Sequence, residues 1–147
     1  MRLSTLTILV GCFFLGCSPY HVTLLAPTSE AGALAIMFCD LPSHQGELVR
    51  VRAIYSGVEE YWGLEAPDSC STLKNVYLED GELYRNTEGD PIWRRLRDLR
   101  SKYSLLEGEL EVTGTFQADS TAGFGHLNSF KSQIVAKSLT LIRIREK

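Results

Sequence analysis

The 147-residue sequence lacks the motifs that mark the common catalytic sites. It has no Gly-x-Ser-x-Gly motif, and the Gly-Phe-Gly at 123–125 has neither the lysine nor the following helix of a phosphate-binding loop. Its three histidines are scattered, so nothing in their spacing indicates a metal site. The adjacent carboxylates Glu59 and Glu60 would point to opposite faces of a strand and cannot flank one glycosidic bond. We therefore expect no enzyme activity, no metal and no cofactor.

An excess of positive charge is also absent, because the formal net charge is −3. A chain of this balance has no general attraction for nucleic acid. The charges are unevenly distributed, with acidic residues concentrated in 59–90 and arginines in 91–104. This pattern predicts one acidic side and one basic helix.

No apolar run is long enough for a transmembrane anchor, which needs roughly 20 residues. The apolar segment Leu3–Gly16 follows the basic Arg2, which is the layout of an export signal. It resembles a bacterial lipoprotein signal peptide, in which a cysteine after a small residue is diacylated and becomes the new N-terminus. The resemblance implies a lipid on Cys17. Cys12 is the alternative, but cleavage there would leave a short signal and a very apolar start to the mature chain.

This reading divides the chain into a signal peptide (1–16), a tether to the membrane (17–33) and one folded domain (34–147). An exported domain folds where disulfides persist. After processing at Cys17 two cysteines remain, Cys39 and Cys70, and neither belongs to a Cys-x-x-Cys motif. We expect them to form a structural disulfide.

Alternation of apolar and polar side chains, interrupted by turn residues, predicts a mainly β domain. The predicted strands cover 46–55, 59–64, 73–78, 109–116 and 132–145. The irregular alternation of the last strand predicts a bulge or a strong bend. Residues 33–41 fit either a short helix or a strand.

Asp90 and Pro91 are typical of a helix start, as N-cap and first helical residue. The apolar residues that follow have helical spacing, so we expect them to face the core and the arginines between them to face solvent. The helical face consists of Ile92, Leu96, Leu99 and Tyr103, with Trp93 beside it.

The order of three strands, a helix and two strands is that of an OB-fold. Residues 46–53 resemble the first strand of bacterial OB-like domains, with Ala53 in place of the usual glycine, and 111–116 resemble the fourth. The segments 123–127 and 133–135 also resemble exported bacterial proteins of this kind, a resemblance that brings no established activity. We therefore predict a small five-stranded OB-like β-barrel with one α-helix between strands 3 and 4. In such a barrel the first and fourth strands pair, so Arg50 and Arg52 should face Glu109 and Glu111.

OB-like barrels bind ligands through strands 2 and 3 and the loops after strands 1 and 4. Here those regions contain aromatic groups able to stack on a sugar or base, or to anchor a peptide. The predicted ligand-binding residues are Tyr61, Trp62, Phe124, His126 and Phe130. A second interpretation stays open, in which Trp62 and Phe130 cap the core and His126 makes a local hydrogen bond.

Together these features predict a membrane-tethered envelope lipoprotein, facing the periplasm or the cell surface. We expect it to act as a binding module for an envelope protein, a peptide or a glycan. The alternatives are a single-stranded nucleic-acid-binding OB domain, which the acidic balance disfavours, and a hydrolase with an unrecognised site.

If Cys17 carries the lipid, the mature protein will incorporate labelled palmitate and partition into detergent. Cys17→Ala will abolish both, because the thiol is the acylated group. Labelling that survives Cys17→Ala and disappears with Cys12→Ala would move the site to the earlier cysteine.

Overall fold

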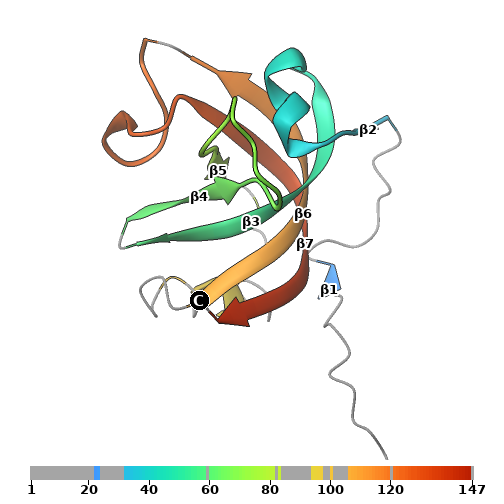
Figure 1. The fold of residues 1–147 in the computed structure, drawn as a ribbon, viewed down its shortest axis with the longest axis vertical. Coiled ribbons are helices and arrows are strands. Elements are labelled where there is room, and N and C mark those ends of the chain that lie inside the picture. Colours follow the sequence, from blue (N-terminus) through green and yellow to red (C-terminus); the bar gives the residue numbers. More distant parts are fainter. Residues whose placement is uncertain are drawn as a thin grey trace, which may run out of the picture.

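Most of the predicted domain is described by a computed structural model (Figure 1). The described residues are 22–23, 32–58, 60–81, 83, 94–97, 100, 106–119 and 121–146. The predicted signal peptide and the predicted lipid site at Cys17 lie outside them.

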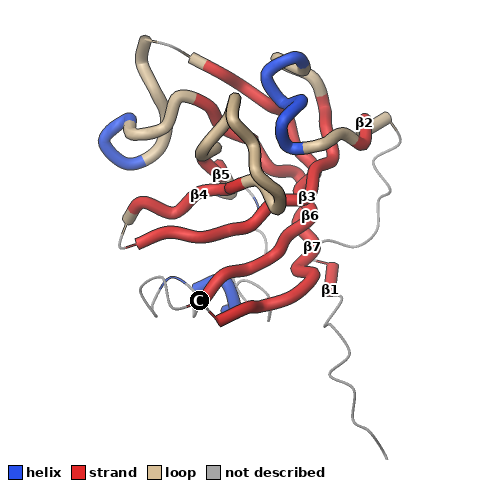
Figure 2. The backbone as a smooth tube through the Cα atoms, in the orientation of Figure 1, coloured by secondary structure: helices blue, strands red, loops and turns tan. Residues whose placement is uncertain are grey.

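Three long strands and four short ones make up the sheet, with two 3-10 helices in the connections (Figure 2). The strands are β1 (Val22–Thr23), β2 (Leu34–Ala35), β3 (Leu48–Val58), β4 (Tyr61–Glu65), β5 (Tyr77–Glu79), β6 (Leu106–Ala118) and β7 (Ser132–Glu146). The 3-10 helices are η1 (Phe38–Ser43) and η2 (His126–Asn128). The segment 33–41, which fitted a helix or a strand, contains one of each.

The strands form one mixed sheet in the order β1-β7-β6-β3-β2, with β4 paired to β3 and β5 paired to β7. Apart from the two-residue β1, six strands form this open sheet. The prediction of a five-stranded OB-like barrel is therefore wrong. The predicted antiparallel pairing of the strand near Leu48 with the strand near Val112 is confirmed, since β3 and β6 pair from Leu48↔Thr115 to Tyr55↔Gly108.

The short strands explain why the sheet stays open. A barrel needs a continuous ladder between every pair of neighbours. Among the described residues, β4 reaches the β5 side of the sheet through one isolated bridge, Leu64↔Val76, with backbone hydrogen bonds of 2.7 and 2.9 Å. Because β5 has three residues, the pairing with β4 does not continue beyond this bridge.

Two register shifts in the ladder between β6 and β7 confirm the bulge predicted for the last strand. One lies between Glu109 and Leu110 of β6, and the other between Thr113 and Gly114. Each extra residue on β7 reverses which side chains face inward, because the side-chain period of a strand is two. The inward residues of β7 accordingly change from Ile134 to Leu139 and Leu141, both buried. Beyond the last shift, Arg143 and Arg145 face outward together.

The core lies on the inner side of the curved sheet and comes mainly from the three long strands. It includes Val49, Val51, Ala53 and Tyr55 of β3, Leu110, Val112 and Phe116 of β6, and Ile134, Leu139 and Leu141 of β7. Burying one such aliphatic side chain contributes about 1.5–3 kcal/mol before entropy is counted. The predicted alternation of β3 and β6 thus describes their buried faces correctly.

The basic helix is described in part, at 94–97 and Arg100. Leu96 is buried and Arg100 is exposed, as predicted, but Arg100 also contacts the sheet. Its Nε donates a hydrogen bond to the Tyr55 hydroxyl, and its Nη2 lies 3.3 Å from Asp80 Oδ2. Burial raises the pKa of the Tyr55 hydroxyl, so it stays protonated. The contact attaches the helix to β3.

Cys39 of η1 and Cys70 form the predicted disulfide, with Cα atoms 5.7 Å apart. The bond closes a sequence separation of 31 residues. It fastens the irregular segment 66–76, between β4 and β5, to η1. The prediction of this pair is confirmed.

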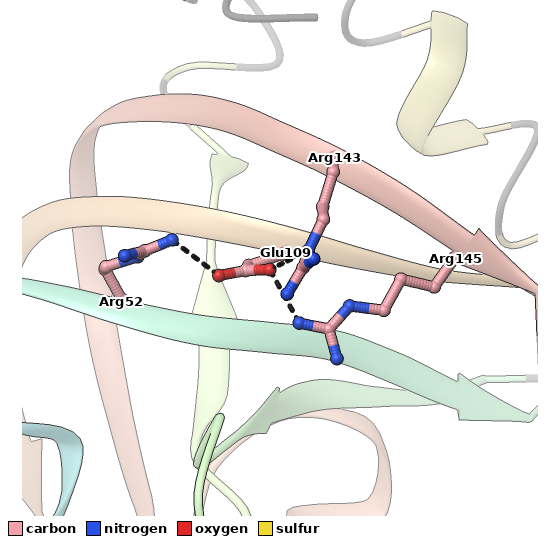
Figure 3. A network of polar contacts seen from close by, with 4 residues as sticks. All are labelled: Arg52, Glu109, Arg143 and Arg145. Carbon is pink, nitrogen blue, oxygen red and sulfur yellow. Dashed lines mark hydrogen bonds and ion pairs between the residues drawn. The ribbon is translucent and has the colours of Figure 1, made fainter. Parts of the chain in front are cut away.

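Glu109 of β6 is the centre of an ion cluster between the three long strands (Figure 3). Its side chain is 4% exposed, and it accepts hydrogen bonds at 2.7 Å from Nη2 of Arg52 and of Arg145, and another from Nε of Arg143. The predicted facing pairs are partly wrong. Arg52 lies opposite Glu111 but bonds the diagonal neighbour Glu109. Thr113, not a carboxylate, lies opposite Arg50.

Desolvation opposes the ionisation of Glu109, but the hydrogen bonds from Arg145 and Arg143 outweigh it and lower the pKa of the carboxyl group. Glu109→Gln should therefore lower the free energy of unfolding by about 1–3 kcal/mol at pH 7, which urea unfolding will measure. A lowered pKa stabilises the fold above the usual value of 4.5, and that stabilisation is lost as the pH falls through the folded-state pKa. The difference between the two proteins should shrink in acid.

Glu111→Gln is the matched control, since it removes the same charge at the next outward-facing residue of β6. We expect a change within about 0.5 kcal/mol. An equal loss in both variants would contradict the special role of Glu109.

Candidate functional site

The predicted ligand-binding region contains a groove of about 490 Å³, between the start of β4, the segment 72–75 and the segment 129–132. Tyr61 and Phe130, two of the predicted ligand-binding residues, line it. Lys74 and Lys131 line it as well, and its described lining residues include no carboxylate. Its volume is in the range of sites for small ligands or short segments of a larger partner.

Tyr61 and His126 meet at one side of this region, although 65 positions separate them in the sequence. Their rings pack edge to face with centroids 5.5 Å apart. Nε2 of His126 lies 3.0 Å from Oε2 of Glu60. Because Tyr61 is 42% exposed, its ring remains accessible to a ligand. The structure thus joins the turn between β3 and β4 to η2.

Phe130 and Phe124 hold the two ends of the loop before β7 together. Their backbones form an antiparallel bridge, with N to O distances of 2.8 and 3.2 Å. The Phe130 ring is buried and packs on Tyr77, with centroids 5.5 Å apart. Phe130 therefore forms the floor of the groove and not an exposed stacking surface.

Trp62 lies in the core and is not available at the surface of the groove. It is buried, and its ring packs on Tyr55 with centroids 5.3 Å apart. Its Nε1 has no hydrogen-bond partner among the described residues. For Trp62 and Phe130, the structure agrees with the interpretation that they cap the core.

Sequence reasoning missed the polar part of the groove. Lys74 falls in the predicted strand 73–78, but β5 begins only at Tyr77, so Lys74 lies in an irregular segment, as Lys131 does. In such segments no periodicity predicts the direction of a side chain. Ser132, the first residue of β7, is buried, and its Oγ has no hydrogen-bond partner within the described part of the chain. A buried hydroxyl without a partner is costly, and Ser132 is one of the residues that line the groove.

Within the described residues, no group of His, Cys, Asp or Glu side chains has the arrangement of a metal site. The same part of the chain has no helix with the length and apolar character needed to cross a membrane. Comparisons with protein-family models, curated proteins and solved structures found no match.

Gly125 sets the position of the loop against the groove floor. Its φ of 69° and ψ of −161° belong to a region that glycine alone readily adopts. A Cβ atom there would lie 2.8 Å from the Tyr77 ring and 3.0 Å from the Phe130 ring. Backbone strain of about 1–3 kcal/mol would add to this clash. Gly125→Ala should lower the melting temperature and displace Phe130.

Gly46→Ala is the control, because Gly46 also has a positive φ, of 78°, but nothing lies within 4 Å of its added Cβ. Thermal unfolding should show a clearly smaller loss for Gly46→Ala. Equal losses would mean that the loop does not pack on Tyr77 and Phe130.

Proposed function

We propose that this protein is a bacterial envelope lipoprotein that acts as a binding module and not as an enzyme. In this proposal a lipid on Cys17 holds the domain at the membrane, facing the periplasm or the cell surface. The domain then contacts an envelope protein, a peptide or a glycan. The observation that carries the binding role is the groove beside Tyr61, with two lysines and no carboxylate among its described lining residues.

The charge of the groove favours a partner with acidic groups. Lys74 and Lys131 are both exposed, so their ammonium groups remain hydrated and free to reorient. Exposed charges of this kind speed association with a complementary partner and fix its orientation more than they increase the affinity. The exposed ring of Tyr61 supplies the apolar contact, as tyrosine commonly does at interfaces.

The burial of Trp62 and Phe130 argues against the alternative of single-stranded nucleic acid. Proteins that bind single strands stack successive bases on exposed aromatic rings. Here two of the predicted rings are covered by the core.

Site-specific photocrosslinking in the native envelope tests the binding role. A benzoylphenylalanine in place of Tyr61 should give a discrete crosslinked product, because the partner contacts that ring. The same group in place of Lys137, an exposed residue of β7 outside the groove, is the control. Adding Lys74→Glu and Lys131→Glu to the Tyr61 probe should reduce the product several-fold.

Equal products from the two positions would show that the groove has no special role. A product unaffected by the lysine substitutions would contradict the acidic partner. Both experiments use membranes from cells, so they read binding independently of catalysis.

A further inference from the structure

A second pocket, of about 440 Å³, lies around the Glu109 cluster and shares no lining residue with the groove. One wall is cationic and consists of Arg52, Arg143 and Arg145, gathered on the buried carboxylate of Glu109 (Figure 3). A second, apolar part of the lining comes from residues 36–38 and 66–67. The pocket therefore combines a charged wall with an apolar one.

The arginines have donor capacity beyond Glu109. The side chains of Arg52 and Arg143 are 58% and 51% exposed, so part of each guanidinium faces the pocket or solvent. Nε of Arg145 is buried without a hydrogen-bond partner among the described residues. A guanidinium has five N–H donors, and one carboxylate cannot accept all those of three arginines.

The charge of the lining favours a monoanion. Three arginines against the two carboxylates Asp68 and Glu109 leave one positive charge in excess. A carboxylate carries one negative charge and matches the planar fork of a guanidinium. A second, mobile carboxylate would meet the same donors from the pocket side.

The apolar wall indicates what this carboxylate is attached to. Met37 is 68% exposed and Pro67 is also exposed, while Phe38, which lines the same pocket, is buried. An exposed methionine adapts to different apolar shapes. The disulfide between Cys39 and Cys70 joins the two chain segments that form this wall, which preorganises it.

We propose that this pocket binds a carboxylate carried on an apolar group, such as the C-terminus of a peptide with an apolar last residue or a short fatty acid. The carboxylate lies against Arg52 and Arg143, and the apolar group covers Met37 and Pro67. This site is independent of the proposed groove and of the lipid anchor.

The test follows the arginine Nε–H signals of the full-length chain by NMR during titration with N-acetyl-leucine. The Nε–H signals of Arg52 and Arg143 should shift and saturate, and that of Arg50, which does not line the pocket, should stay in place. N-acetyl-leucine amide lacks the charge, and acetate lacks the apolar group, so each should bind at least several-fold more weakly. Hexanoate stands for a short fatty acid and N-acetyl-leucine for the C-terminus of a peptide. Whichever of the two binds more tightly identifies the source of the carboxylate.

Two variants separate binding from folding. Arg52→Gln should weaken N-acetyl-leucine binding about tenfold, whereas Arg50→Gln, which removes the same charge two residues away, should not. Met37→Gln leaves the ion cluster intact at an exposed position. It should weaken N-acetyl-leucine binding a few-fold and leave acetate unchanged.

Several results would overturn the proposal. They are equal affinity for the acid and its amide, equal affinity for acetate and N-acetyl-leucine, equal loss from Arg50→Gln and Arg52→Gln, or no shift of the Arg52 and Arg143 signals. Inorganic phosphate binding more tightly than N-acetyl-leucine would also reject it, because the pocket would then select a phosphate and not an apolar carboxylate.

Discussion

The antiparallel ladder between β6 and β7 is the constraint on which the rest of the structure depends. Both strands are long, and the two register shifts bend them and change which β7 side chains face inward. Leu139 and Leu141 therefore fill the core, while Arg143 and Arg145 reach Glu109 on the outside. Without these extra residues, the same sequence would place arginine in the core or leucine in solvent. The core and the cationic pocket thus share one cause.

The strands were predictable because alternation is a local property of the sequence. Val49, Val51 and Ala53 on β3, and Leu110 and Val112 on β6, are buried as their period of two indicates. Closure of the sheet was not predictable in this way, because it depends on how far two short, distant strands pair. The aromatic residues alone did not predict which rings would reach the surface: Trp62 and Phe130 are buried, while Tyr61 is exposed. The pairing of Glu109 with three arginines required the register, which the sequence pattern alone does not supply.

The irregular segment between β4 and β5 links the two candidate sites. Residues 66–68 line the cationic pocket, and residues 72–75 line the groove. Cys70 lies between them and is bonded to Cys39 of η1. A segment without regular secondary structure has little to fix its path. One covalent bond therefore restrains a wall of each site. The disulfide thus does more than close the loop between its two cysteines.

The pairing of β1 with β7 bears on where the cationic pocket would lie in a cell. Val22 pairs with Leu141, two positions before Arg143. If the lipid is on Cys17, five residue steps, or about 17 Å of fully extended chain, separate the acyl anchor from the sheet. The domain would then stay close to the bilayer surface instead of sampling a wide volume. Amphiphilic carboxylates concentrate in that surface layer, so the pocket would meet them at a local concentration well above that in the surrounding fluid.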